Sequence, residues 1–151
     1  MRKSYGPVAW IIASRVGPRI KNQKKKESNY KDGKSDGLVV VWHRNGQKEA
    51  EINFKDGKEN GLWTRWHNNG QKEQEIYFKD GKEDGLWIDW DKNGQKSVEA
   101  NYKDGKMDGV AVLWHKNGQK KSERNWKEGK MIYEKFWNSK GESVDTKEEA
   151  K

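Results

Sequence analysis

Two rows of titratable side chains recur along the chain, and both are of residue types that can carry chemistry. The histidine row consists of His43, His67 and His115, with Asp91 at the remaining equivalent position. The glutamate row consists of Glu51, Glu75, Glu99 and Glu123. Imidazole and carboxylate groups that converge on one point bind divalent metals, and a pair of carboxylates can hydrolyse a glycosidic bond.

The spacing of these rows argues against both kinds of chemistry. Equivalent residues are 24 positions apart, and if each interval forms one β-hairpin they lie two strands apart, roughly 9.6 Å. The ligands of one zinc ion each lie about 2 Å from it, so we interpret the histidines as polar residues that flank turns. Glycosidases need two carboxylates in different environments, whereas four equivalent glutamates share one environment. We therefore expect a non-enzymatic protein without catalytic residues, metal or cofactor.

The elements that position these rows form a repeat of 24 residues. Three series of glycines mark it: Gly33, Gly57, Gly81, Gly105 and Gly129; Gly37, Gly61, Gly85 and Gly109; Gly46, Gly70, Gly94 and Gly118. Asn-Gly and Asp-Gly pairs separate runs of alternating polarity, which predicts one hairpin per repeat. Residues 23–30 are a degenerate copy of residues 47–54, and Tyr133 stands where a glycine is expected near the other end. We predict an all-β fold, an elongated single-layer antiparallel meander of about ten strands.

The register of the strands follows from side-chain parity, because a slip of one residue turns every side chain to the other face. A two-residue Asn45-Gly46 turn pairs Val41 with Ala50. A three-residue loop that adds Arg44, with Gly46 left-handed, pairs Val40 with Ala50 and Trp42 with Lys48. We predict the second arrangement because it gathers one apolar face: Leu38, Val40, Trp42, Ala50, Ile52 and Phe54. The same reasoning predicts a three-residue loop at Lys55-Asp56-Gly57 and a mostly polar opposite face with Trp63, Arg65, Glu73 and Glu75.

The predicted apolar face measures on the order of 1,000 Å², more than monomers usually expose. Sheet curvature, the N-terminal leader, a second copy or another protein could cover it. The candidate binding residues on this face are Trp42, Trp66, Trp90, Trp114, Phe54, Phe78 and Tyr102. The tryptophans have two interpretations, a platform for a peptide or glycan, or a core over which the stems of Lys48, Lys72, Lys96 and Lys120 pack.

The recurring motif Tyr-Lys-Asp-Gly-Lys-x-Asp-Gly-Leu-Trp-x-x-Trp-x-x-Asn-Gly-Gln-Lys resembles MORN repeats, in the bacterial variant found in YwqK-family antitoxins. The resemblance covers residues 23–142 approximately. It implies an elongated single-layer sheet used for protein association and sometimes proposed to contact membranes. It therefore predicts a protein-protein interaction scaffold, the antitoxin-like member of a toxin-antitoxin pair, whose partner is a homodimer mate or a cognate toxin. The alternative is a membrane-surface or glycan-binding module.

The charge of the chain is unevenly distributed. The sequence has 32 Lys and Arg against 24 Asp and Glu, a net charge of +8. Residues 1–29 contain eight of the basic residues and one glutamate, so the remaining 122 residues carry only +1. A nucleic-acid binder is expected to show a basic stripe on its folded surface, so we expect no nucleic-acid partner. The lysines beside the Asp-Gly turns are interspersed with acidic residues, which predicts weak contact between the array and a membrane surface.

The chain divides into three parts by this reasoning. Residues 1–21 form a basic leader, either poorly ordered or a weak targeting segment; residues 22–142 form the repeat array; residues 143–151 form a polar tail. The apolar run at residues 7–13 after a basic start has the pattern of a short signal peptide. Without such a signal the expected location is cytoplasmic. The absence of cysteine excludes a disulfide framework.

Overall fold

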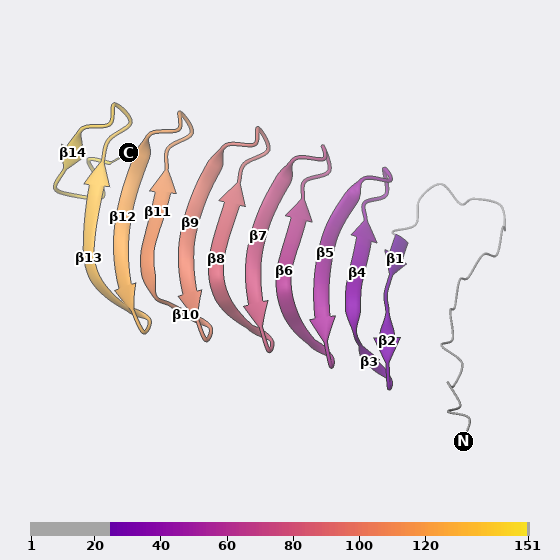
Figure 1. The fold of residues 1–151 in the computed structure, drawn as a ribbon. Helices are drawn as coiled ribbons and strands as arrows, with labels where there is room; N and C mark the ends of the chain where they lie inside the picture. Colours follow the sequence, from indigo (N-terminus) through magenta and orange to yellow (C-terminus); the bar gives the residue numbers. More distant parts are fainter. Residues whose placement is uncertain (1–24, 151) are drawn as a thin grey trace, which may run out of the picture.

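A computed structural model describes residues 25–150, which form a curved layer of antiparallel strands in a meander (Figure 1). The main sheet has 12 strands in the order β1-β4-β5-β6-β7-β8-β9-β11-β12-β13-β14, with β10 paired to β9, and β2 and β3 form a separate pair. The predicted all-β hairpin meander is confirmed. No helix among the described residues is long and apolar enough to cross a membrane. The leader, residues 1–21, lies outside them.

The strands follow the repeat closely. The first are β1 (Lys25–Glu27), β2 (Tyr30–Lys31), β3 (Lys34–Ser35) and β4 (Gly37–Trp42). The central strands are β5 (Lys48–Lys55), β6 (Lys58–Trp66), β7 (Lys72–Lys79), β8 (Lys82–Trp90) and β9 (Lys96–Lys103). The last are β10 (Lys106–Met107), β11 (Gly109–Trp114), β12 (Lys120–Lys127), β13 (Lys130–Trp137) and β14 (Ser143–Val144).

The degenerate N-terminal copy belongs to the sheet. Glu27 pairs with Val40 in the register by which Glu51 pairs with Thr64, 24 residues further along the chain. The array therefore begins before its first full repeat.

The two turns of each repeat differ in length. At Asn45-Gly46 the amide of Gly46 donates to the carbonyl of His43 at 3.0 Å, and the amide of His43 donates to Gln47 at 2.8 Å. With Gly46 left-handed at φ 89°, this is the predicted three-residue loop, a type I turn with a bulge. At the other end Lys55 pairs directly with Lys58. The predicted three-residue loop there is wrong, because Asp56 and Gly57 both adopt positive φ, 51° and 84°, as a two-residue type I′ turn requires.

A β-bulge shifts the register beyond the Asn-Gly loop. Trp42 pairs with Lys48 as predicted, but Val41 then pairs with Ala50, so Glu49 is an extra residue in β5. The predicted pair of Val40 with Ala50 is therefore wrong. Side-chain parity predicts the faces only for strands without insertions, because one inserted residue reverses the faces beyond it.

The two faces of the sheet consequently have a different composition from the prediction. Directly paired residues point to the same side of a sheet. One side, which we call the core face, carries a row across the strands: Val39, Ile52, Trp63, Ile76, Trp87, Ala100 and Ala111. The other side, which we call the ladder face, carries Leu38, Val40, Trp42, Trp66 and Glu75. The predicted single apolar face is thus split, since Ala50, Ile52 and Phe54 lie on the core face together with Trp63 and Arg65.

The hydrophobic core lies on the core face. Val39 and Ile76 are each 3% exposed, and Ala100 and Ala111 are each 2% exposed. The side chains of Trp63 and Trp87 flank Ile76 on the two neighbouring strands. Burial of one such aliphatic side chain contributes about 1.5–3 kcal/mol, and these residues therefore hold successive hairpins in one layer.

Candidate functional site

The histidine row ties successive repeats together. The ring nitrogen Nε2 of His43 lies 2.9 Å from the main-chain oxygen of Trp66, that of His67 lies 3.1 Å from Trp90, and that of His115 lies 2.9 Å from Trp137. Each ring therefore donates Nε2–H to the strand end of the next hairpin. The interpretation as turn-flanking polar residues is confirmed. No group of three possible metal ligands occurs among residues 25–150.

Asp91 departs from this row and serves its own turn instead. Its carboxylate accepts the amides of Asn93 at 2.8 Å and Gln95 at 3.0 Å, and these two hydrogen bonds lower the pKa of Asp91. A shallow hollow of about 150 Å³ lies beside it, lined in part by Lys96, Trp114 and His115. A carboxylate cannot donate to the carbonyl of the next repeat, so this loop lacks the tie that a histidine provides.

One tryptophan at each strand end lies under a lysine from the preceding repeat. We call this series the tryptophan ladder: Trp66, Trp90, Trp114 and Trp137. The ammonium groups of Lys48, Lys72, Lys96 and Lys120 lie 5.7, 5.7, 5.5 and 5.0 Å from the ring centres of Trp66, Trp90, Trp114 and Trp137. The ammonium group of each lysine also forms an ion pair with the glutamate three residues further along the chain. Its distance to the carboxylate oxygen is 2.5 Å for Glu75, 2.5 Å for Glu99 and 2.7 Å for Glu123. Lys48 pairs with Glu51 in the same way. The lysine hydrogen bond lowers the pKa of Glu123. The glutamates and the tryptophans therefore share one face, contrary to the register prediction.

The seven predicted binding residues do not form one surface. Trp42, Trp66, Trp90 and Trp114 lie on the ladder face, whereas Phe54, Phe78 and Tyr102 lie on the core face. There Phe78 packs against Trp63 and Tyr102 against Trp87, with ring centres 5.4 Å apart in both pairs. Burial raises the pKa of Tyr102. The tryptophans of the ladder face and the aromatic residues of the core face thus both make contacts within the array.

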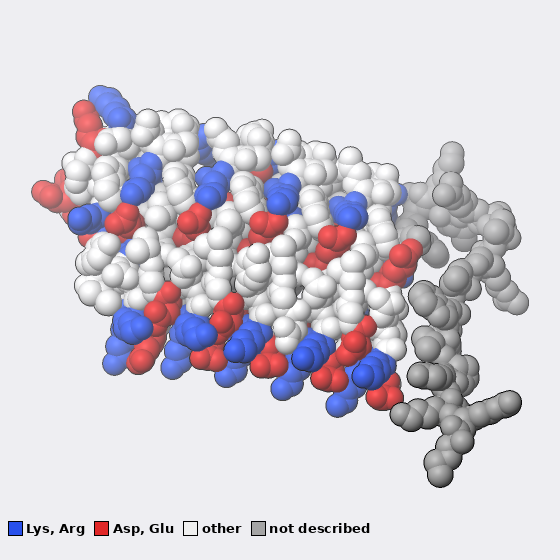
Figure 2. Space-filling model, viewed as in Figure 1, with Lys and Arg blue, Asp and Glu red and all other residues white. Residues whose placement is uncertain are grey.

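The rim formed by the Asp-Gly turns is locally neutralised. Lys103 Nζ lies 2.9 Å from a carboxylate oxygen of Asp84, and Lys127 Nζ lies 3.1 Å from Asp108. The same carboxylates accept the amides of Asp104 and Glu128. The lysine hydrogen bonds, followed by these amides, lower the pKa of Asp84 and of Asp108. Figure 2 shows this alternation of positive and negative side chains along the lower rim.

An uncharged band runs across the ladder face between the Lys-Glu rows and the rim (Figure 2). It consists of Leu38, Asn53, Leu62, Tyr77, Leu86, Asn101, Val110, Asn125 and Tyr133. Four of its large hydrophobic side chains are well exposed: Tyr77 at 46%, Leu38 at 40%, Val110 at 40% and Tyr133 at 38%. The band therefore offers apolar side chains to solvent along the length of the sheet.

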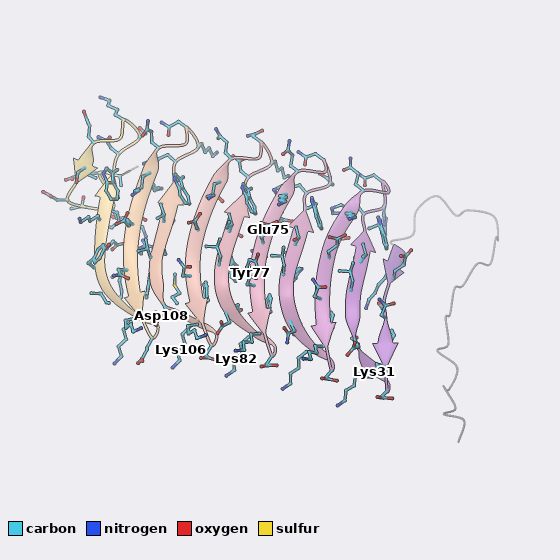
Figure 3. The ribbon with its side chains drawn as sticks, in the orientation of Figure 1. Lys31, Glu75, Tyr77, Lys82, Lys106 and Asp108 are labelled. Carbon is cyan, nitrogen blue, oxygen red and sulfur yellow. The ribbon has the colours of Figure 1, made fainter. Side chains whose placement is uncertain are left out.

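Tyr77 lies in the middle of this band (Figure 3). In the sequence it interrupts a column of asparagines that recurs every 24 residues. The amide of Asn53 donates to the carbonyl of Leu62 at 2.8 Å, and that of Asn101 donates to Val110 at 3.1 Å. Asn29 makes the equivalent contact with Leu38 at 3.3 Å. The phenol ring of Tyr77 cannot reproduce this local bond and is turned to solvent instead. Tyr77 is not among the binding residues predicted from the sequence, although its exception to the asparagine column was a signal that could have found it.

A single-layer array of hairpins built on a 24-residue period defines a repeat protein. The repeat family described as "MORN repeat variant" matches residues 35–56, 59–80, 83–104 and 107–128, more than half of the chain. The chain therefore belongs to this family. MORN repeats are typically binding modules for proteins or membranes and are generally non-enzymatic.

No curated protein matches the chain in sequence. A solved structure described as "accessory secretory protein 1,2 and 3 in Streptococcus pneumoniae" is 18% identical with a TM-score of 0.27, and the match covers 69% of this chain and 17% of that one.

Proposed function

We propose that this protein is a non-enzymatic scaffold that binds another protein along the uncharged band, with Tyr77 at the centre of the contact. The observation that supports this most directly is the exchange of a structural asparagine for an exposed tyrosine. The ring is 46% exposed, and its position loses a hydrogen bond that three other repeats make. Binding of a partner gives the exchange a physical reason.

The composition of the band matches the centre of a protein interface. Interfaces combine an apolar centre with a polar rim, and tyrosine is enriched among the residues that dominate binding energy. Here Leu38, Tyr77 and Val110 supply the apolar centre, while the paired rows of lysine and acidic residues border it on both sides. From β4 to β13 the band crosses eight strand spacings of about 4.8 Å, or about 38 Å. It therefore fits an extended or flat apolar surface of a partner.

The charged borders favour a protein over an anionic membrane. The rim lysines alternate with acidic residues, and Lys103 and Lys127 are engaged by carboxylates, so the array presents little net positive charge to lipid headgroups. A cognate toxin is one partner to test, because the motif resembles that of YwqK-family antitoxins.

The experiment that tests the proposal replaces Tyr77 with asparagine, the residue at the equivalent position of the neighbouring repeats. Tyr77→Asn removes the exposed ring and allows the amide to donate to the carbonyl of Leu86, as Asn53 does to Leu62. The full chain and the variant would be used to capture proteins from a lysate of the native organism, and an enriched protein would be purified and titrated by calorimetry. We expect Tyr77→Asn to weaken its affinity at least about tenfold without loss of fold.

The matched control lies on the other face. Tyr102→Phe retains the packing against Trp87, and we expect it to bind like the wild type. A partner that binds Tyr77→Asn as tightly as the wild-type chain would contradict the proposal. Flotation of the chain with anionic vesicles, undiminished in Tyr77→Asn, would instead support the membrane-binding alternative.

A further inference from the structure

Four loops of the array share the tetrapeptide Asn-Gly-Gln-Lys, which begins at Asn45, Asn69, Asn93 and Asn117. An asparagine before a glycine can lose its side-chain amide without an enzyme. The glycine nitrogen gives up its proton and bonds to the asparagine Cγ, the bond from Cγ to Nδ2 breaks, and ammonia leaves. Water then opens the cyclic succinimide to aspartate or isoaspartate. Because the reacting pair and the two residues after it are identical in the four loops, differences in rate must come mainly from their structure.

Several structural factors are the same in the four loops. Both residues of each Asn-Gly pair are exposed. Each glycine is left-handed, with φ between 80° and 89°, and its amide donates to the carbonyl three residues earlier at 2.9 or 3.0 Å. Access of water and the state of the attacking nitrogen therefore do not distinguish the loops. A further pair, Asn60-Gly61, lies inside strand β6, where sheet pairing restrains the main chain.

In three of the loops the asparagine side chain is held at both ends. The side-chain oxygen of Asn69 accepts the amide of Gln71 at 3.0 Å, and its Nδ2 donates to the main-chain oxygen of Lys92 at 2.8 Å. The equivalent two bonds hold Asn45 and Asn117. The second bond reaches the loop of the next hairpin. Ring closure requires the side chain and the following peptide to rotate toward each other, and both bonds oppose this rotation.

Asp91 changes the hydrogen bonds of Asn93. Its carboxylate accepts the amide of Gln95 at 3.0 Å, the amide that an asparagine oxygen accepts in the other loops. The main-chain amides of Gln95 and Asn93, and then the side-chain amide of Asn93, lower the pKa of Asp91. Within residues 25–150, Asn93 makes no side-chain hydrogen bond to Lys116, which corresponds to Lys92 in the preceding repeat. The side chain of Asn93 is therefore held only by a neighbour in its own loop.

We propose that Asn93 is the residue at which this protein deamidates first, so that it becomes aspartate and isoaspartate faster than Asn45, Asn69 and Asn117. Of the two bonds that restrain the other three side chains, one is absent at Asn93, and the other is replaced by the contact with Asp91. Loss of one such hydrogen bond corresponds to a rate about three- to tenfold higher. This inference goes beyond the proposed binding function and does not depend on it.

The reaction at Asn93 changes the charge of the array without removing a bond between its repeats. At Asn69 the same reaction would remove the donor to the next loop, whereas Asn93 has no such bond to lose. The product places a second carboxylate beside that of Asp91, and isoaspartate also lengthens the main chain of the loop. Asn93 is thus a position at which the array gains a negative charge and keeps the ties between its hairpins.

The first test ages the full wild-type chain in mildly alkaline buffer. Cleavage after glutamate places the four loops in four different peptides, and the mass gained when the amide becomes a carboxyl, located by fragment spectra, follows each asparagine. We expect Asn93 to react about three- to tenfold faster than the other three. In concentrated urea, where the loops are unfolded, the four rates should agree. Equal rates in the folded chain, or a faster Asn93 that persists in urea, would overturn the proposal.

The second test exchanges the residues at position 91 and its equivalent in the preceding repeat. Asp91→His installs the residue of the other three loops, so we expect Asn93 to slow to the rate of Asn69. His67→Asp should accelerate Asn69 by about three- to tenfold. Asn117, whose bonds lie in other loops, is the internal control and should react at one rate throughout. An Asn93 that stays fast in Asp91→His, or an Asn69 that stays slow in His67→Asp, would refute the role of Asp91.

Discussion

Lys72 places its ammonium group 5.7 Å from the ring centre of Trp90 and, at the same time, 2.5 Å from a carboxylate oxygen of Glu75. One lysine thus connects the strand β7 to a ring at the end of β8. Lysines of three other repeats do the same with Trp66, Trp114 and Trp137. The tryptophan ladder is therefore a structural device that links adjacent hairpins through the ladder face.

The variant Lys72→Met tests the energy of this link. Methionine keeps most of the apolar stem and removes the charge, so the cation–π contact and the ion pair are both lost. We expect the free energy of unfolding to fall by about 0.5–1.5 kcal/mol in urea titrations at low salt. Lys92→Met, at an exposed loop position, serves as the control and should change stability by less than about 0.5 kcal/mol. Equal stability of the two variants would contradict the structural role of the ladder.

The variant His67→Ala tests the tie between the turn of one repeat and the strand end of the next. The ring of His67 bonds the main-chain oxygen of Trp90 at 3.1 Å. Loss of one such hydrogen bond should lower the free energy of unfolding by about 0.5–1.5 kcal/mol. Urea titration measures this, with Lys92→Ala in the adjoining loop as the control. A loss no greater than that of the control would show that the tie contributes nothing.

The repeat and one of its two turns could be predicted from the sequence, whereas the length of the Asp-Gly turn was predicted wrongly. Asn45-Gly46 identified a loop with a left-handed glycine, and Gly46 has that conformation. The interval of 24 residues predicted the hairpins and the degenerate first copy. As expected for such a copy, β1 pairs with β4 in the register of the later repeats. These features depend on a few adjacent residues, so the sequence contains the information directly.

The orientation of the faces could not be predicted, because it depends on pairing between strands. Residues 38–41 are Leu-Val-Val-Val, so either parity buries apolar side chains and the alternation is ambiguous. The bulge at Glu49 then decides the outcome, and its position follows from how two strands pack rather than from a turn motif. The same limit applies to the candidate surface: the sequence shows that Tyr77 replaces an asparagine of the repeat, but only the strand register places its exposed ring on the ladder face.

The rim carboxylates predict a loss of stability in acid. The ordinary aspartate pKa is 3.8, and lysine and amide hydrogen bonds lower the pKa of Asp84 and Asp108 in the folded chain. A lowered folded-state pKa contributes stability that is present above the unfolded value and is lost as the pH falls through the folded value. We therefore expect Asp84→Asn, which installs the residue found at the equivalent Asn60, to flatten the decline of stability below pH 3.8. Thermal unfolding at stepped pH measures this, and an unchanged slope would contradict the assignment.

Gly61 and Gly85 occupy the same position in successive repeats, but we expect an alanine at the two sites to lower stability by different amounts. Gly85 has a φ of 131°, and a Cβ atom built on it would lie 3.0 Å from Cβ of Tyr77. At Gly61 the φ is 103° and the nearest atom, Cβ of Asn53, is 3.6 Å away. Both substitutions to alanine strain the backbone by about 1–3 kcal/mol, but only Gly85→Ala adds a steric overlap, which raises its expected cost to about 2–4 kcal/mol. Urea titration of the two variants gives the comparison directly. If Gly61→Ala destabilises the chain as much as Gly85→Ala, the close approach of Tyr77 to the bulge is not what distinguishes the central repeat.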